Sequence, residues 1–383
     1  MSIIGSTFNS LEKYLAKTKF ERTRKFMFNR TERFIRKFDL PPLSAEEKDM
    51  IDEQWKRIPI KPYEDEYRLF KYYARFDSRF ITQDLQYPYL YNAINPVAER
   101  KALSNKGMYS IYFHEMPQPK TIITCIAGTY FNAERKIINN SEAEKIVRSH
   151  ERCIVKPILE TKQGKNIKIF CTQSEDTSAL FSDKKGNFIV QEIQGQSTLT
   201  SQFNPASLNT FRVTTIFLNG VVSTSNVCFK FARNGVQIDN LGHGGLIMGV
   251  EEDGHFHDFG VDKDYQKVFT YQEGKKISDI YIPEVSKAID FAKKYHPIYF
   301  PTLTLVGWDI ALNSDNQPIL IEANLITPGI QAEQYCAQKS VYGDRTEEII
   351  DFVLSNPRHY LFLNDKDNTS EYFAQTPSKI NNK

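Results

Sequence analysis

The sequence is poor in features that define several large classes of protein. None of its apolar runs approaches the roughly 20 residues of a membrane-spanning helix, and its N-terminus lacks the apolar core of a signal peptide. Its five cysteines form no Cys-x-x-Cys pair and are odd in number, so neither a disulfide framework nor a zinc site is indicated. The formal net charge of only +2 gives no general argument for nucleic acid as a partner. These absences favour a reducing, cytoplasmic location.

Internal repeats and a regular strand–helix rhythm are also missing. The 383 residues are enough to bury a sizeable core and predict two or three subdomains. From about residue 100, short β-rich runs alternate with polar turns and a few helices, which predicts an α+β fold. No Ser–His or Cys–His arrangement typical of nucleophilic catalysis is visible.

The N-terminal 40 residues are basic and helical in pattern. Residues 8–38 contain ten Lys or Arg and three Glu, and their aromatic and leucine side chains recur near helical spacing. Two interpretations stay open. Either the helix packs by its apolar side and leaves a solvated basic face, or it docks on an anionic surface such as a membrane or a polyanionic substrate. Ser44 and Glu47 then predict the capping box of another helix.

Local signals predict several later elements. Asn219–Gly220 is a strong turn dipeptide between two β-rich runs and predicts a hairpin. Ser141, followed by Glu144, predicts the start of a helix over residues 141–150. Further expected elements are an amphipathic helix over 285–296, a closing helix over 345–354 and a polar, disordered tail over 364–383.

A second hairpin is predicted by the stretch GWDIALNSDNQPILIEAN. Two apolar runs flank NSDNQ, whose residues hydrogen-bond their own backbone in turns. If Asn313 pairs with Pro318 across the turn, the antiparallel register places Asp309 opposite Glu322. Side chains in such a pair lie roughly 5 Å apart at Cβ.

Asn324 completes a candidate metal site on this hairpin. It lies two residues after Glu322 and so shares its face, opposite Gly307, which has no side chain to obstruct it. Two facing carboxylates repel, so either one is protonated or a cation lies between them. Two carboxylates and an amide oxygen are hard ligands that suit Mg²⁺ shared with a phosphate substrate. The alternative is a hairpin face whose carboxylates are simply in water.

Lys156 is a candidate phosphate ligand. It precedes Pro157 near the end of an apolar strand, and a polar loop with Gly164 and Lys165 follows. Glycine allows close backbone approach to a ligand, and lysine acts as a point charge on phosphate. The alternative is a surface hairpin with a solvated lysine.

The strand NFIVQEIQG, residues 187–195, is a candidate adenine-binding element. Its backbone could hydrogen-bond an adenine edge, with Gln191 or Glu192 within reach of the base or the ribose. The alternative is a strand that ends in polar residues.

The order of these pieces resembles the ATP-grasp superfamily, and within it the sugar-transfer-associated branch. The resemblance covers roughly residues 100–335, and the branch-level likeness rests on NPASLNTFRVTT, IDNLGHGG and GWDIAL…PILIEAN…GIQ in this order. It implies two α+β subdomains that close on Mg-ATP. The implied division is a basic helical segment over 1–85, a small subdomain over 86–190, a large subdomain with the metal site over 191–363 and a tail over 364–383.

The resemblance also implies roles for single residues. Lys106 and Lys156 would bind the nucleotide phosphates, and Asp309, Glu322 and Asn324 would hold Mg²⁺. Further implied assignments are Lys162, Gly164 and Lys165 in the hairpin over the phosphates, Val190, Gln191, Glu192 and Ile193 in the adenine strand, and Asp239, Asn240, His243, Gly244 and Gly245 on the acceptor side.

The sequence also departs from the superfamily. Many ATP-grasp ligases have an arginine two residues before the metal aspartate, where this sequence has Gly307. Arg212 is the expected substitute, bearing on the transferred phosphoryl group or a substrate carboxylate, and its alternative role is a structural salt bridge. Gln196 stands where the branch often has Gln-His. His255 and His257 have a spacing that could bind metal, but no third ligand accompanies them.

The implied activity is ATP-dependent joining of a carboxylate to an amine through an acyl phosphate. Arg212 and Lys156 would be the catalytic residues, with ATP and Mg²⁺ as cofactors. The expected partners are a small-molecule or saccharide acceptor and an amine donor in surface-polysaccharide assembly, no nucleic acid, and an anionic membrane surface touched by the N-terminal helix. Two alternatives stay open: an ATP-grasp-type kinase of a non-carboxylate group and a non-catalytic nucleotide-binding module.

Overall fold

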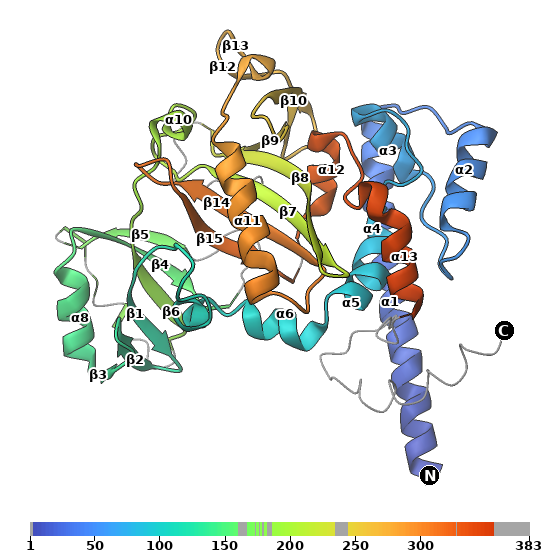
Figure 1. Ribbon diagram of the computed structural model, residues 1–383. Helices are drawn as coiled ribbons and strands as arrows, with labels where there is room; N and C mark the ends of the chain where they lie inside the picture. Colours follow the sequence, from blue (N-terminus) through green and yellow to red (C-terminus); the bar gives the residue numbers. More distant parts are fainter. Residues whose placement is uncertain are drawn as a thin grey trace.

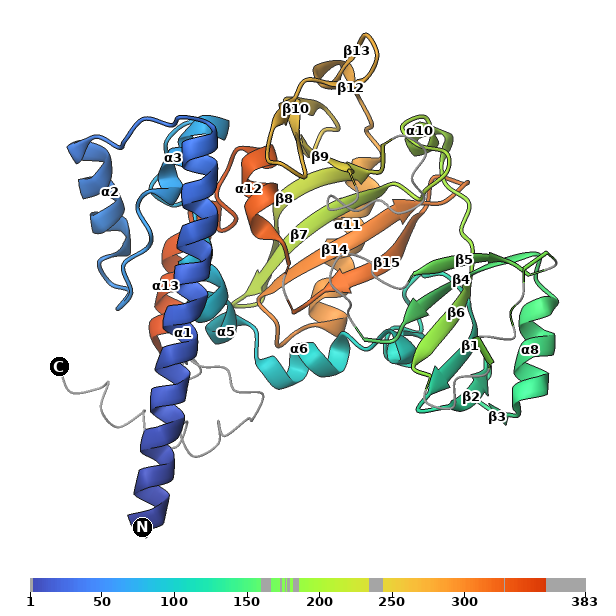
Figure 2. The same cartoon turned by 180° about the vertical axis from the view of Figure 1, so that it is seen from behind.

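The protein has three parts, and the predicted α+β class with a helical N-terminal region is confirmed. Helices come first, then a small six-stranded sheet, then a larger seven-stranded sheet that lies between the other two parts (Figure 1). The view from behind shows the same arrangement (Figure 2). The computed structural model describes residues 3–159, 167–172, 174–175, 177, 180–181, 186–233, 244–326 and 328–355.

The N-terminal part is a layer of helices that opens with the predicted long basic helix, α1 (Ile3–Lys37). The predicted capping box starts α2 (Ala45–Trp55): Ser44 Oγ accepts a hydrogen bond from the Glu47 backbone N–H at 3.1 Å. Short helical segments follow: α3 (Glu66–Tyr73), α4 (Gln83–Leu85), η1 (Gln86–Leu90), α5 (Tyr91–Ile94), α6 (Val97–Leu103), η2 (Lys106–Met108) and α7 (Tyr109–Tyr112).

The small sheet has the strand order β3-β2-β1-β6-β4-β5, with antiparallel neighbours throughout. One face is closed by α8 (Asn140–Arg148), whose Ala143 and Val147 join the buried cluster of this part. The predicted start of α8 at Ser141 was wrong: the N-cap is Asn139, which accepts from the Glu142 backbone N–H at 2.9 Å. The strands are β1 (Thr121–Ile126), β2 (Thr129–Asn132), β3 (Ile137–Ile138), β4 (Arg152–Pro157), β5 (Lys168–Cys171) and β6 (Phe188–Glu192).

The large sheet is also antiparallel, with the order β11-β10-β9-β8-β7-β14-β15. Asn219 and Gly220 form the predicted turn between β7 and β8, with φ of 52° and 76°. The strands are β7 (Thr210–Leu218), β8 (Val221–Phe231), β9 (Leu246–Val250), β10 (Phe256–Asp262), β11 (Lys267–Val268), β14 (Leu305–Leu312) and β15 (Pro318–Asn324). Smaller elements beside it are α10 (Thr198–Ser201), β12 (Thr270–Gln272), β13 (Lys275–Lys276), η5 (Ile277–Asp279) and η6 (Gly343–Arg345).

Both faces of the large sheet are covered, which is why all eight residues of β14 are buried. One face packs on α11 (Val285–Tyr299). The other packs on α12 (Ile330–Ala337), α13 (Thr346–Ser355) and the N-terminal helices, in one continuous apolar cluster. The N-terminal layer therefore shares its core with the sheet that carries the candidate metal ligands.

Among the described helices, none is both long and apolar enough to cross a membrane. The predicted disordered tail over 364–383 lies outside the described residues. The division of the chain at residues 85, 190 and 363 stays a prediction.

Candidate active site

The β14–β15 hairpin brings the three predicted metal ligands onto one face. Asp309 lies opposite Glu322, and Asn324 lies opposite Gly307, as predicted. The predicted turn was one residue off, because the Asn313 N–H bonds the Gln317 carbonyl at 2.9 Å, and a bulge after Asp309 compensates.

Gly307 leaves room for this face. A Cβ at this position would lie 3.1 Å from Pro328 Cβ and 3.6 Å from both Arg212 Cδ and Asn324 Cβ. A larger side chain would therefore crowd Pro328.

Asp309 is neutralised by two cations of the protein. Arg212 on β7 donates to both of its carboxylate oxygens, at 2.7 and 3.0 Å, and Lys230 Nζ on β8 lies 2.8 Å from Oδ1. Burial by itself raises the pKa of Asp309, but Arg212 and Lys230 outweigh it and keep that pKa well below its usual range. The expectation that the facing carboxylates need a bound cation or a proton was thus incomplete, since side chains supply the positive charge.

Lys230 and Glu333 are charged members of this site that the sequence did not predict. Glu333 on α12 is fully buried. It accepts hydrogen bonds from Arg212 Nη1 at 3.0 Å and from Thr214 Oγ1 at 2.5 Å. A lone Lys between Phe229 and Phe231 in a buried strand was an available signal for Lys230. For Glu333 no local signal existed, because its partner Arg212 is 121 residues away.

Lys106 reaches the same face from η2. Its Nζ lies 2.8 Å from Glu322 Oε1, and its backbone N–H bonds the Ile158 carbonyl just after β4 at 2.7 Å. Asn105 fixes this turn by accepting from the Gly107 N–H at 3.0 Å. The structure therefore brings Lys106 together with the predicted metal ligands.

Lys156 and Gln191 share one face of the small sheet. Lys156 pairs with Ile189 and Gln191 pairs with Ile154, and all four point away from the buried cluster under α8 because side chains alternate along a strand. Lys156 is 8% exposed. The side chains of Val190 and Glu192 point to the opposite face, so only part of the predicted adenine strand shares the side of Lys156.

The connection between the two sheets runs beside the turn of the β14–β15 hairpin. After Ile193, which is half-exposed, the Ser197 N–H bonds the Leu312 carbonyl at 3.0 Å. Gln196 is structural: its amide donates to the carbonyls of Asn204 and Ser207 at 3.0 and 2.8 Å. The Ser197–Leu312 hydrogen bond therefore joins this connection to the end of β14 at the hairpin turn.

Only part of the predicted acceptor and phosphate loops falls within the described residues. Gly244 has φ of 90°, its carbonyl accepts from Arg233 Nε at 3.0 Å, and Gly245 leads into β9. Lys162, Gly164, Lys165, Asp239, Asn240 and His243 lie outside the described residues.

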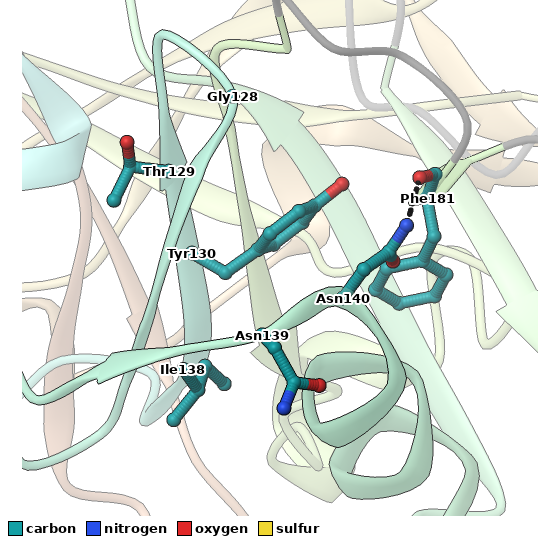
Figure 3. A pocket seen from close by; sticks show the side chains of 7 residues that line it. All are labelled: Gly128, Thr129, Tyr130, Ile138, Asn139, Asn140 and Phe181. Atoms are coloured by element: carbon teal, nitrogen blue, oxygen red, sulfur yellow. Dashed lines mark hydrogen bonds between the residues drawn. The ribbon is translucent and has the colours of Figure 1, made fainter.

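A separate cavity of about 360 Å³ lies at the start of α8, beside the β1–β2 turn (Figure 3). Asn140 Nδ2 closes one side of it by donating to the Phe181 carbonyl at 2.7 Å. Its lining contains none of the acidic or lysine residues described above, so it is not the candidate active site. The lining residues are Gly128, Thr129, Tyr130, Ile138, Asn139, Asn140 and Phe181.

Two antiparallel sheets joined by one connection, and a face of paired acidic and basic side chains, are features of an ATP-grasp protein. A comparison with known families matches residues 86–349 to the one described as sugar-transfer associated ATP-grasp. This match spans more than half of the chain, so the protein belongs to that family, and the predicted resemblance is confirmed. A search of the curated proteins gave no match.

Several solved structures are similar to this chain. One is the ATP-grasp ligase PsnB complexed with a phosphomimetic variant of its minimal precursor, Mg and ADP, at 12% identity and TM-score 0.39, covering 69% of this chain and 62% of that one. Another is D-alanyl-alanine synthetase A from Vibrio cholerae O1 biovar eltor, at 11% identity and TM-score 0.39, covering 67% and 66%. An L-amino acid ligase from Bacillus licheniformis matches at 10% identity and TM-score 0.38, covering 69% and 48%. The chain thus spans 62% of the first of these proteins.

Proposed function

We propose that this protein is an ATP-dependent carboxylate–amine ligase that acts through an acyl phosphate. The observation that carries the proposal is the face on which Asp309, Glu322 and Asn324 lie together, in contact with Arg212 and Lys106. Phosphoryl transfer needs positioning and charge neutralisation more than a nucleophile on the protein. This face combines oxygen ligands for a cation with bases for phosphate.

The donor set fits Mg²⁺. Glu322 and Asn324 offer a carboxylate and an amide oxygen, because Asn324 Nδ2 donates to Asp309 Oδ2 at 3.1 Å and leaves its own Oδ1 for a cation. The oxygens of Asp309 already accept from Arg212, Lys230 and Asn324, so Asp309 would bind the ion in exchange for one of these contacts. Among the described residues, no group of three or more His, Cys, Asp or Glu is arranged to hold a metal, so this mixed set is the candidate. When bound, the ion would neutralise charge on the terminal phosphates.

The bases around this face have separate proposed roles. Lys106 and Lys156 neutralise the nucleotide phosphates, and Arg212 bears on the transferred phosphoryl group or the substrate carboxylate. Gln191 shares the face of Lys156 and supports the nucleotide together with the backbone from Val190 to Ile193. The loop residues Lys162, Gly164, Lys165, Asp239, Asn240, His243, Gly244 and Gly245 keep their implied phosphate and acceptor roles as part of the proposal.

The proposed substrates are a saccharide or other small-molecule acid and an amine, in the assembly of surface polysaccharide. The family description, sugar-transfer associated, supports this choice, and no nucleic acid is included. All five cysteines are free, which supports a cytoplasmic location for the reaction.

The same proposal includes contact of α1 with an anionic membrane surface. Arg22, Lys25, Arg33 and Arg36 are exposed and lie within one side of the helix together with Phe26, which is 64% exposed. We call these five residues the basic stripe. Figures 1 and 2 both show the N-terminal half of α1, which precedes the basic stripe, extending beyond the other helices.

Trapping with hydroxylamine tests the ligase assignment. The protein is incubated with Mg-ATP, a pool of sugar acids and amino acids, and hydroxylamine in place of the amine. An acyl phosphate has an electrophilic carbonyl, so we expect an ATP-dependent hydroxamate, detected by mass spectrometry. Asp309→Asn and Lys156→Ala serve as controls and should abolish the product, because each removes a charge from the proposed site.

Other outcomes support the alternatives. ADP formation with a stable phosphorylated product and no hydroxamate would favour a kinase. Binding of Mg-ATP without consumption of ATP, with lipid-linked saccharides also tested as acceptors, would favour a non-catalytic nucleotide-binding module.

A further inference from the structure

Arg212 is bound on two sides by acids from different elements. Its Nε and Nη2 donate to Asp309 on β14, and its Nη1 donates to Glu333 on α12. After these three bonds, one hydrogen on Nη1 and one on Nη2 remain among the contacts of the described residues.

Glu333 is itself fixed in orientation. It is fully buried, and its second carboxylate oxygen accepts from Thr214 Oγ1 at 2.5 Å, two residues along β7 from Arg212. Arg212, Lys230, Asp309 and Glu333 carry two positive and two negative charges in a buried cluster. A buried charge without a partner is costly, so this balance keeps the guanidinium group in place.

The N-terminal layer holds α12 on both sides of Glu333. Gln331 Nε2 donates to Glu66 Oε1 at 2.5 Å, and Gln334 Nε2 donates to the Ile81 carbonyl at 3.0 Å. The Tyr335 ring stacks on Tyr73, with ring centroids 4.4 Å apart. Residues two positions before and one position after Glu333 are thus bonded to the N-terminal layer, which lies outside the two sheets.

We propose that Glu333 is a positioning residue that, held by the N-terminal layer through α12, fixes the guanidinium group of Arg212 for phosphoryl transfer. This inference rests on the proposed function for its catalytic consequence, whereas the orientation of Arg212 is a property of the protein alone. The two can therefore be tested separately.

The orientation is measured by NMR of arginine side chains, with the Arg212 signals assigned from an Arg212→Lys variant. A guanidinium group bound by two acids rotates slowly, so the wild type should give resolved Nη1 and Nη2 signals. Glu333→Gln keeps the volume but removes the charge, and we expect these signals to merge. Thr214→Val frees one oxygen of Glu333 and should broaden them partly. Tyr342→Phe removes a comparable buried bond, 2.8 Å to Gln86 of the N-terminal layer, and should leave them unchanged.

The catalytic consequence is measured as the kcat and KM for ATP in the hydroxamate reaction. Glu333→Gln should lower kcat at least tenfold and change KM less than about threefold. The lost interaction positions Arg212 for the phosphoryl group in the transition state rather than for binding of ATP. Thr214→Val should show a smaller effect of the same kind. Tyr342→Phe should retain wild-type values.

Unchanged Arg212 signals in folded Glu333→Gln, or an equal change in Tyr342→Phe, would overturn the inference. So would a wild-type kcat in folded Glu333→Gln. If the wild type makes no hydroxamate while its Arg212 signals respond as expected, the ligase assignment fails and the positioning of Arg212 by Glu333 stands.

Discussion

At the scale of single residues, the charged side chains of the site form ion pairs that differ in burial and therefore in their contribution to stability. Asp309 is 7% exposed and contacts two cations, whereas the pair of Glu322 and Lys106 is partly exposed. Removing one partner of a buried ion pair leaves the other charge without compensation, and an exposed pair contributes little.

Asp309→Asn should therefore destabilise the protein in the absence of metal, by about 3 kcal/mol. The facing carboxylates alone would predict no loss, because the substitution would relieve their repulsion. Glu322→Gln should cost no more than about 1 kcal/mol. Urea unfolding at pH 7 in the presence of a chelator measures both losses of stability.

The low pKa of Asp309 means that its contribution to the unfolding free energy is present above pH 4 and is lost as the pH falls below that value. Equal stability of Asp309→Asn and the wild type would contradict this assignment of charges.

Two buried groups that do not belong to this face, Glu66 and His296, have opposing effects on the pH dependence of stability. Burial, with a contribution from Asp84, raises the pKa of Glu66 to about 7, so stability from this residue falls as the pH rises from 4.5 to 7. Burial lowers the pKa of His296 to about 4, so stability falls as the pH drops from 6.5 to 4. Between pH 4.5 and 6.5 the contributions of Glu66 and His296 to the change of unfolding free energy with pH have opposite signs and nearly cancel.

Substituting Glu66 or His296 should reveal the pH dependence of the unfolding free energy that the other residue contributes. Glu66→Gln should lose stability on acidification from pH 6.5 to 4.5, by about 1.4 kcal/mol per pH unit at most. His296→Gln serves as the matched variant and should gain stability over the same range. Unfolding free energies at pH 4.5, 5.5 and 6.5 provide the comparison. Parallel pH profiles for both variants and the wild type would rule out these pKa shifts.

At the scale of elements, turns and caps follow short sequence signals. The β7–β8 hairpin turns at Asn219–Gly220 as predicted, since both residues adopt positive φ, which asparagine and glycine tolerate. The start of α8 was misjudged because NNSEAEK contains two overlapping capping signals, Asn139 with Glu142 and Ser141 with Glu144. The first is used, directly after β3 ends.

Gly220→Ala should cost about 1–2 kcal/mol, because a Cβ at φ of 76° is strained even though no atom lies within 4 Å of it. Gly195→Ala is the control, since its φ is not positive and its Cβ would make only an ordinary 3.6 Å contact with Ser314. The control should change the unfolding free energy by less than about 0.5 kcal/mol. Thermal unfolding of both variants provides the measurement, and similar losses for the two would contradict the backbone argument.

At the scale of the whole molecule, the N-terminal layer has two faces. Its inner face shares an apolar cluster with the large sheet, and Arg24 pairs with Asp84 at 2.8 Å. Its outer face carries the basic stripe. Arg24 is therefore a poor choice for testing membrane contact, because its substitution would disturb packing as well as surface charge.

Reversal of Arg22, Lys25, Arg33 and Arg36 to Glu should weaken binding to anionic vesicles at least tenfold, since each base near such a surface contributes about 1 kcal/mol. Hydroxamate formation from soluble substrates should stay unchanged, because the stripe lies outside the site. The matched control reverses four exposed lysines outside the N-terminal layer, Lys136, Lys145, Lys275 and Lys276. Sedimentation with vesicles that contain phosphatidylglycerol compares the forms, and equal binding by both would favour a helix with a merely solvated basic face.

The sequence by itself determined the local structure and the identity of the candidate metal ligands. The pairing of Asp309 with Glu322 was predicted from the turn, although the turn is one residue off and a bulge after Asp309 restores the pairing. The α2 cap and the Asn219–Gly220 hairpin depend on contacts between near neighbours. Such interactions are set by backbone geometry over a short length of chain, so they can be predicted without knowledge of the fold.

Only the tertiary structure decided which charges meet. Asp309 and Arg212 are 97 residues apart, and they are neighbours because β7 lies between β8 and β14 in the sheet. That strand order also brings Lys230 to Asp309, and the packing of α12 brings Glu333 to Arg212. The ionisation and orientation of the site depend on these distant contacts, because a buried charge is stabilised by whatever partner the fold places beside it.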